Sequence, residues 1–173
     1  SANVPRWQMA LYLTRMADKA GHTLGSGADQ GFTDISGYSA AIQTAINQIK
    51  QLGVTVGKTA TTFAPDDNVT REEMAMFIER LAAATTAGPG GTSDATAAGT
   101  ATTYINNIDT DYNFADIDSG TVTYEGHNAI IELWQMGITD LSHGATAYRP
   151  TEDITRAEMA TFMTNFLGHT NAR

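Results

Sequence analysis

The chain repeats a ten-residue pattern, and this repeat constrains its fold more than any other feature. Residues 69–78 read VTREEMAMFI and residues 154–163 read ITRAEMATFM, at a constant offset of 85. Residues 4–13 read VPRWQMALYL and match residues 69–78 at an offset of 65. Similarity of this kind predicts an array of small units that bury their apolar faces against one another.

The match extends upstream in two of the three copies. Residues 63–65 correspond to 148–150, residues 52–55 to 136–139, and residues 32–35 to 114–117. The offset drifts from 82 to 84 to 85, which indicates short insertions in loops. We therefore expect units at 32–84 and 113–168, with 1–20 forming the last helix of an incomplete first unit. Residues 85–112, rich in Ala, Thr and Gly, are expected to be a linker or exposed loop.

The first helix of each unit is predicted by apolar residues at helical spacing. In the second unit these are Tyr38, Ala41, Ile42, Ala45, Ile46, Ile49 and Leu52, and in the third Ala129, Ile130, Leu133, Trp134 and Met136. Trp134 is expected in the core. Gly53 and Gly137 follow directly, and a glycine there predicts a left-handed residue that ends the helix.

The second helix of each unit opens with a predicted capping box. Thr70 with Glu73, and Thr155 with Glu158, have the Thr-x-x-Glu spacing that satisfies free helix N–H groups reciprocally. An apolar stripe follows and is expected to be core: Met74, Phe77, Ile78 and Leu81; Met159, Phe162, Met163 and Phe166; and Met9, Tyr12, Leu13 and Met16 in the first copy.

Composition excludes several classes of function. The formal net charge is −9 and no Lys/Arg cluster is present, so a nucleic-acid partner is not expected. No apolar run approaches the ~20 residues that cross a bilayer, so we expect no membrane insertion. Cysteine is absent, and neither a metal-ligand spacing of His nor a nucleophile or phosphate-binding motif occurs. We therefore expect no enzyme activity and no cofactor.

The motifs, in their order, resemble the S-layer homology family. That order is Phe-x-Asp, a helix, Gly-Val/Ile-Thr, an aromatic-x-Pro turn and a Thr-Arg-x-Glu helix start. Residues 155–158 read TRAE, as in the family, whereas 70–73 read TREE and 5–8 read PRWQ. The resemblance implies an all-α fold of tandem two-helix repeats, packed as a pseudo-trimer around a central helical bundle, here with the first repeat incomplete. It also implies an extracellular module at the cell surface that binds cell-wall polysaccharide between repeats.

Three arginines at matching positions are the candidate glycan-binding residues, because the resemblance implicates the arginine of the Thr-Arg-x-Glu motif. Arg6, Arg71 and Arg156 fall in the first turns of their helices, where a cation opposes the helix dipole by roughly 0.3–1 kcal/mol. A compensating anion is therefore expected. It is either Asp34, Asp116 or an adjacent Glu, or a carboxylate, pyruvyl or phosphate group of an acidic glycan.

Two further features have open alternatives. Trp7 is either a stacking platform for a sugar or a packing residue. Asp109, Asp111 and Asn113 have the alternating oxygen ligands of a calcium loop, but the glycine and glutamate of an EF-hand are missing. They form either an irregular calcium site or a solvated acidic turn.

The incomplete first unit motivates an alternative function. An open helical stripe needs a partner, so the chain is alternatively a structural subunit of an extracellular assembly such as an S-layer, a filament or a virion. The repeats would then pack against copies of the chain or against other surface or virion proteins. No signal peptide is visible, and we expect the chain to be a mature or truncated piece of a longer protein.

Overall fold

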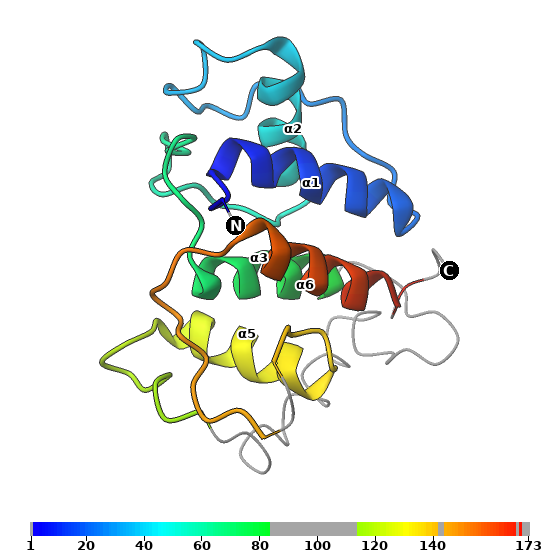
Figure 1. The fold of residues 1–173 in the computed structure, drawn as a ribbon. Helices are drawn as coiled ribbons and strands as arrows, with labels where there is room; N and C mark the ends of the chain where they lie inside the picture. Colours follow the sequence, from blue (N-terminus) through cyan, green and yellow to red (C-terminus); the bar gives the residue numbers. More distant parts are fainter. Residues whose placement is uncertain (1, 84–113, 142–143, 169, 171–173) are drawn as a thin grey trace.

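The computed structural model describes residues 2–83, 114–141, 144–168 and 170. In these residues the chain is helical and has no strand: α1 (Arg6–Lys19), α2 (Ala40–Gln51), α3 (Arg71–Ala83), α5 (Tyr124–Gln135) and α6 (Arg156–Gly168) (Figure 1). The predicted all-α class is confirmed. The predicted linker at 85–112, including Asp109 and Asp111, lies outside the described residues, as does Asn113.

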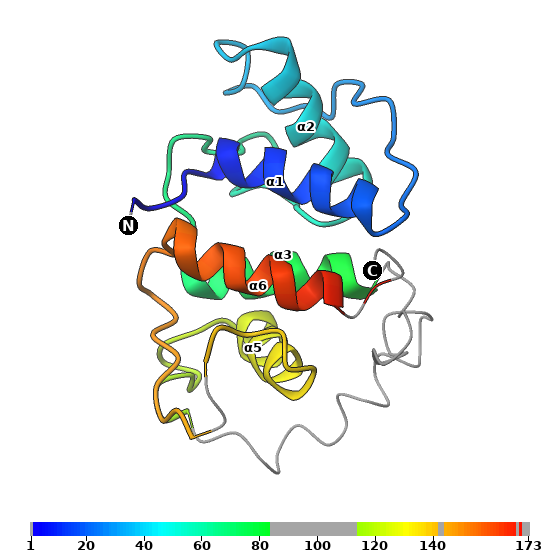
Figure 2. The same cartoon turned by 45° about the vertical axis from the view of Figure 1, so that its right-hand side comes forward.

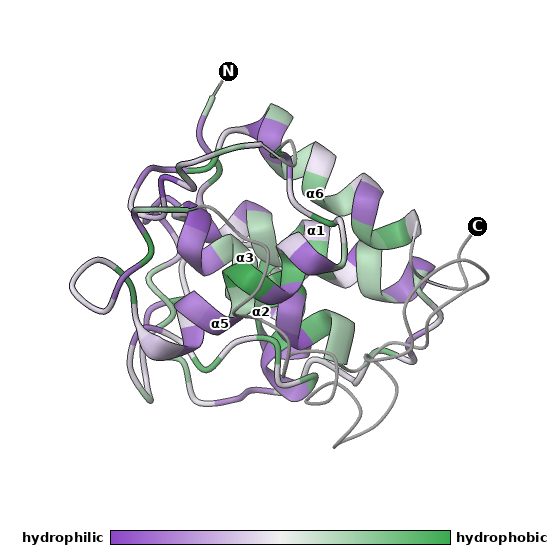
Figure 3. Cartoon of the chain, turned by 90° about the horizontal axis from the view of Figure 1, so that it is seen from below, coloured by the Kyte–Doolittle hydropathy of each residue, from purple (hydrophilic) through white to green (hydrophobic). Residues whose placement is uncertain are grey.

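The helices are arranged as a central group with one helix on each side. Helix α6 contacts both α1 and α3, whereas α2 packs against α1 and α5 packs against α3. Figure 2 shows α1, α3 and α6 running side by side, with α2 above them and α5 below. Each first helix of a unit therefore covers the last helix of the unit before it. Viewed from below, hydrophobic residues gather where the helices meet, and the outer loops are more hydrophilic (Figure 3).

Three short segments meet in a closed ring of backbone hydrogen bonds. Val4 N–H donates to the Ile154 carbonyl (3.2 Å), Ile154 N–H donates to the Val69 carbonyl (2.8 Å), and Val69 N–H donates to the Val4 carbonyl (2.9 Å). All three side chains are fully buried. The segments lead directly into α1, α3 and α6, so the central helices start from one common point.

The first residue of each central helix is also bonded to a neighbouring segment. The N–H of Arg6 donates to the Asp67 carbonyl, that of Arg71 to the Glu152 carbonyl, and that of Arg156 to the Ala2 carbonyl, at 2.9, 2.9 and 3.0 Å. A helix start has no partner for such N–H groups within the helix. The neighbouring segment therefore completes each helix start.

The predicted helix signals are confirmed in detail. Gly53 and Gly137 have positive φ angles of 76° and 70°, which a side chain would disfavour. Both capping boxes form: Glu73 N–H donates to Thr70 Oγ1 at 3.2 Å, and Glu158 N–H donates to Thr155 Oγ1 at 3.3 Å. In return, each glutamate accepts from the N–H of its threonine.

Most of the predicted stripe residues are buried, with a few differences. Tyr12 and Met163 are half-buried, and Ala41 is exposed at the start of α2. Trp134 is half-buried rather than enclosed, and its ring meets Phe114 edge-on with centroids 6.4 Å apart. Met163 lies on α6, and in the described residues no first helix covers α6 as α2 covers α1. None of the described helices is long and apolar enough to cross a membrane.

Candidate functional site

Two of the three candidate arginines are buried where consecutive units meet. Arg6 lies between α1 and the unit that follows it, and we call its surroundings the first seam. Arg71 lies between α3 and the unit that follows, and we call its surroundings the second seam. The two residues are only 2% and 0% exposed. A buried guanidinium requires compensating partners, since desolvation of an unpaired charge costs several kcal/mol.

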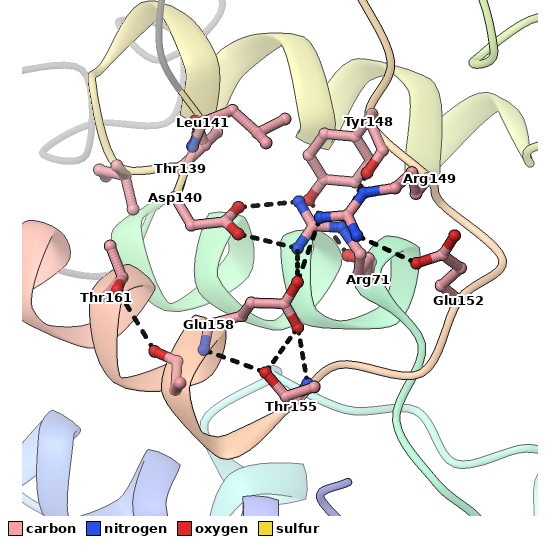
Figure 4. Close-up of polar contacts among 12 residues, drawn as sticks. Arg71, Thr139, Asp140, Leu141, Tyr148, Arg149, Glu152, Thr155, Glu158 and Thr161 are labelled. Atoms are coloured by element: carbon pink, nitrogen blue, oxygen red, sulfur yellow. Dashed lines mark hydrogen bonds and ion pairs between the residues drawn. The ribbon is translucent and has the colours of Figure 1, made fainter. Parts of the chain in front are cut away.

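In the second seam, Arg71 lies among hydrogen-bond acceptors and beside the ring of Tyr148 (Figure 4). Its Nε donates to the Tyr148 carbonyl at 2.7 Å. Nη1 and Nη2 bind the two oxygens of Asp140 at 3.0 and 2.7 Å, and Nη1 also binds Glu158 at 3.1 Å. The guanidinium carbon lies 4.8 Å from the ring centroid of Tyr148 and 5.8 Å from that of Phe162. Both carboxylates and both rings belong to the third unit.

The charges of this seam stabilise one another. Burial lowers the pKa of Arg71, but its hydrogen bonds to Asp140 and the nearby carboxylates raise it by more. Burial also disfavours the charged form of Glu158 and so raises its pKa. Hydrogen bonds from Thr155 and the charges of Arg71 and Arg149 lower this pKa by more. At neutral pH the Arg71 guanidinium and the Glu158 carboxylate are therefore ionised and paired.

In the first seam, Arg6 has fewer anionic partners. Its Nε donates to the Phe63 carbonyl at 2.8 Å, and its Nη1 lies 3.3 Å from Glu73. The guanidinium carbon lies 4.8 Å from the centroid of the Phe63 ring and 5.4 Å from that of Phe77. Burial lowers the pKa of Arg6, and the carboxylate of Glu73 offsets this only in part. The partners Phe63, Glu73 and Phe77 are the repeat equivalents of Tyr148, Glu158 and Phe162.

A pocket opens beside Arg6 in the first seam. It is lined by Arg6, Thr55, Val56, Gly57, Lys58, Glu73, Met76, Phe77 and Arg80. Its volume of about 100 Å³ is that of roughly three water molecules, at about 30 Å³ each. Gly57 has a φ of 90°, and a Cβ there would lie 2.6 Å from the Phe32 ring and from two backbone oxygens. A glycine is therefore required at this edge of the pocket.

The third arginine, Arg156, has a different environment. It is exposed, and its Nη2 donates to Gln8 at 2.9 Å. The three arginines are therefore equivalent in sequence but not in structure.

Asp34 and Asp116 hold the aromatic-x-Pro turns. Asp34 accepts from the N–H groups of Phe63 (3.0 Å) and Ala64 (2.7 Å), and Asp116 from those of Tyr148 (2.8 Å) and Arg149 (2.7 Å). Ala64 and Arg149 have positive φ angles of 55° and 62°, a region that such residues seldom adopt. The two aspartates thus fix the turns whose carbonyls receive the buried arginines.

The expectation that these aspartates form ion pairs with the arginines is wrong in the described part of the chain. The carboxylates within ion-pair distance of Arg6 and Arg71 are Glu73, Asp140 and Glu158. The two glutamates come from the capping box of the following unit rather than from the arginine's own helix. Trp7 is half-buried, and its backbone N–H donates to the Pro65 carbonyl. Whether its ring stacks on a sugar or only packs against the protein stays a prediction.

Two acidic residues of the seams were not singled out by the sequence. Asp140 stands three residues after Gly137, where the second unit has Val56 after Gly53. Glu72 accepts from the N–H and hydroxyl of Thr123, at 2.8 and 2.7 Å, and so joins α3 to the start of α5. A comparison of the repeats could have found both, since Asp140 and Glu72 are acidic where the other unit has Val56 and Ala157.

The described residues contain no group of three or more His, Asp or Glu that could hold a metal ion. The candidate calcium loop lies outside them.

Comparison with known proteins identifies one segment. Residues 31–75 match the family model of the S-layer homology domain. No curated protein matches the chain at a significant level. The matched segment contains α2, the Phe63 turn and the first turn of α3 with Arg71. The resemblance that the motifs predicted is therefore confirmed for this segment.

Proposed function

We propose that this chain is a non-catalytic, extracellular module that attaches a protein to a cell surface by binding cell-wall polysaccharide between its repeats. The match of residues 31–75 to the S-layer homology domain carries this proposal. Attachment to a surface through wall polymers is the function that the resemblance implies for such repeats. In this proposal Arg6 at the pocket is the direct contact, and Arg156 and Trp7 are further candidate contacts. Arg71, Asp34 and Asp116 act indirectly, through the buried ion pairs and the turns that shape the seams.

The arrangement of the units is part of the proposal. We infer that residues 32–84 and 113–168 are SLH-type repeats, that residues 1–20 are the C-terminal helix of an incomplete first repeat, and that the three occupy equivalent positions in a pseudo-trimer. The ring formed by Val4, Val69 and Ile154 supports this inference, because each of the three gives one hydrogen bond and receives one. The matched helix starts at Arg6, Arg71 and Arg156 support it further.

An acidic glycan is the ligand that fits the charge of the molecule best. A chain of net charge −9 repels anionic polymers at long range, so binding depends on local cations. Such cations gather at the first-seam pocket, where Arg6, Lys58 and Arg80 lie beside a single carboxylate, Glu73. The pocket also has apolar lining from Met76 and Phe77, against which a sugar ring can pack.

The test is retention of the chain on purified bacterial cell-wall polymer in a co-sedimentation assay. Lys58 is exposed and lines the pocket, so Lys58→Glu should weaken retention by about tenfold or more through like-charge repulsion. Lys19→Glu makes the same charge change at the exposed end of α1 and should leave retention unchanged. Absence of retention of the unmodified chain, or equal loss in both variants, would overturn the proposal.

A second candidate function is that of a structural subunit in an extracellular assembly. The open face of α6 favours it, because Arg156 and Ala160 are exposed whereas the equivalent Ala10 and Ala75 are fully buried. Such a face suits packing against another copy of the chain or another surface protein. Sedimentation at high concentration tests it. Association that Ala160→Glu abolishes and Thr151→Glu, on an exposed loop, preserves would support this function, and a monomer throughout would exclude self-association.

A further inference from the structure

The two seams differ at one repeat position that faces the buried arginine. Val56 and Asp140 each stand three residues after the glycine that ends the preceding helix. Val56 is 66% exposed at the rim of the first-seam pocket. The Asp140 side chain is only 10% exposed, and it binds Arg71 through both of its oxygens. The same backbone position therefore carries an apolar side chain in one seam and an anion in the other.

In the second seam, the Asp140 carboxylate occupies the place at Arg71 that the anionic group of a ligand would take. A carboxylate that binds a guanidinium through two parallel hydrogen bonds has the geometry by which proteins recognise carboxylate and phosphate groups. Asp140 makes this pair with Arg71, and Glu158 binds the same guanidinium at 3.1 Å. Although Arg6 is only 2% exposed, it lines the first-seam pocket, whereas Arg71 is fully buried and carries both carboxylates on its Nη atoms. An acidic ligand would have to displace Asp140 to reach it.

The first seam has the opposite balance of charge. The residues that line its pocket include the cations Arg6, Lys58 and Arg80 and one carboxylate, Glu73, an excess of two positive charges. The carboxylates of Asp67 and Asp34 also act on Arg6 from outside this lining. Glu73 is shared between Arg6 and Lys58. This local excess lies within a chain whose net charge is −9. A volume of about 100 Å³ accommodates one small anionic group.

We propose that the first seam binds a single carboxylate or phosphate group, and that Asp140 closes the second seam by supplying the equivalent anion from within the chain. The molecule then has one accessible anion site instead of two, and the residue at the position of Val56 and Asp140 determines which seam is open. This inference rests on the proposed glycan-binding function and specifies the seam and the charged group that the function uses.

The test exchanges the two residues and measures anion binding at each arginine. Inorganic phosphate and pyruvate are titrated separately into the full chain, and the Nε–H signals of Arg6 and Arg71 are followed by NMR. In the unmodified chain, Arg6 should respond in a saturable manner and Arg71 should not. The two probes distinguish a phosphate ligand from a carboxylate ligand.

Val56→Asp should close the first seam and weaken the Arg6 response by about tenfold or more. Because Val56 is largely exposed, this variant is expected to fold. Val56→Asn is the control, since asparagine has the shape of aspartate without its charge. Asp140→Asn should create a response at Arg71, and its folding is checked by circular dichroism. Unchanged phosphate and pyruvate binding in Val56→Asp, or an equal response of both arginines in the unmodified chain, would overturn the inference.

The two proposals fail in different ways. Retention on cell-wall polymer without any response to phosphate or pyruvate at Arg6 would refute the anion site and leave the attachment function in place. A response at Arg6 without retention on polymer would refute the attachment function and leave the anion site in place.

Discussion

Arg6, Arg71 and Arg156 occupy the same position of the repeat, and their surroundings depend on the unit that follows each of them. Arg71 is enclosed by two carboxylates of the third unit, Arg6 has one carboxylate of the second, and Arg156 is exposed beside Gln8. One motif residue thus serves as a buried structural ion pair, as the wall of a cationic pocket and as a surface charge. Equal sequence positions do not imply equal roles here.

We predict that Arg71→Ala destabilises the protein by about 3–5 kcal/mol, because it leaves Asp140 and Glu158 without their buried cation. Arg156→Ala removes the equivalent exposed side chain and should change the free energy of unfolding by no more than about 0.5 kcal/mol. Urea unfolding of the two variants measures the difference. Similar losses in both would show that burial of Arg71 does not determine its contribution.

The sequence predicted the two capping boxes correctly and singled out the three arginines, but it did not show which carboxylates pair with them. Asp140 is 69 residues from Arg71 and Glu158 is 87 residues away, so no local spacing connects them. Asp34 and Asp116 were among the partners that the sequence offered for these arginines. Their carboxylates instead satisfy the N–H groups of tight turns, a role that depends on the backbone conformation of distant residues.

Helices α3 and α5 are joined by a contact from the variable position of the Thr-Arg-x-Glu motif, which Glu72 occupies here. Glu72 accepts two hydrogen bonds from Thr123, which caps α5 through a bond from the Gly126 N–H to its hydroxyl at 2.9 Å. A Cβ at Gly126 would lie 2.1 Å from a Glu72 carboxylate oxygen. The glycine therefore leaves space for a carboxylate at a helix N-terminus, where negative charge is favourable.

A double-mutant cycle tests this contact between helices. Glu72→Ala should cost about 1 kcal/mol, as the loss of a helix cap does. In that background Gly126→Ala should stabilise α5 by about 0.5–1 kcal/mol, since alanine is the better helix former. In the unmodified chain the same change should give no gain, because the new methyl group displaces Glu72. Additive free energies of unfolding would contradict the coupling.

The positions of all five described helices followed from apolar periodicity, capping boxes and terminal glycines. Their pairing did not, because periodicity identifies an apolar face without identifying what covers it. Helix α2 packs on α1 and α5 packs on α3, so each unit contributes its first helix to the preceding one. The half-buried Met163 follows from the same rule, since α6 has no such cover in the described residues.

The molecule as a whole is held together where the segments of Val4, Val69 and Ile154 meet. Each contributes a buried side chain and two backbone hydrogen bonds, and the three lie far apart in the sequence. None of these bonds can break alone without exposing a buried backbone group, which is unfavourable. The units are therefore expected to unfold together rather than one at a time.

Native-state hydrogen exchange tests this expectation. The amides of Val4, Val69 and Ile154 should exchange with the same free energy, equal to that of global unfolding. The amide of Thr33, which bonds the carbonyl of the exposed Thr61, serves as a control and should exchange faster. A markedly faster exchange at any one of the three ring amides would show that its unit opens independently.

The three backbone hydrogen bonds that join Val4, Val69 and Ile154 form a closed triangle. The N–H groups of Val4, Val69 and Ile154 are all used within it, so a fourth copy of the segment would find no free donor. Duplication of one more unit could not enlarge the triangle and would have to begin another. Proteins that extend this architecture by tandem duplication are therefore expected to grow by whole triplets of units.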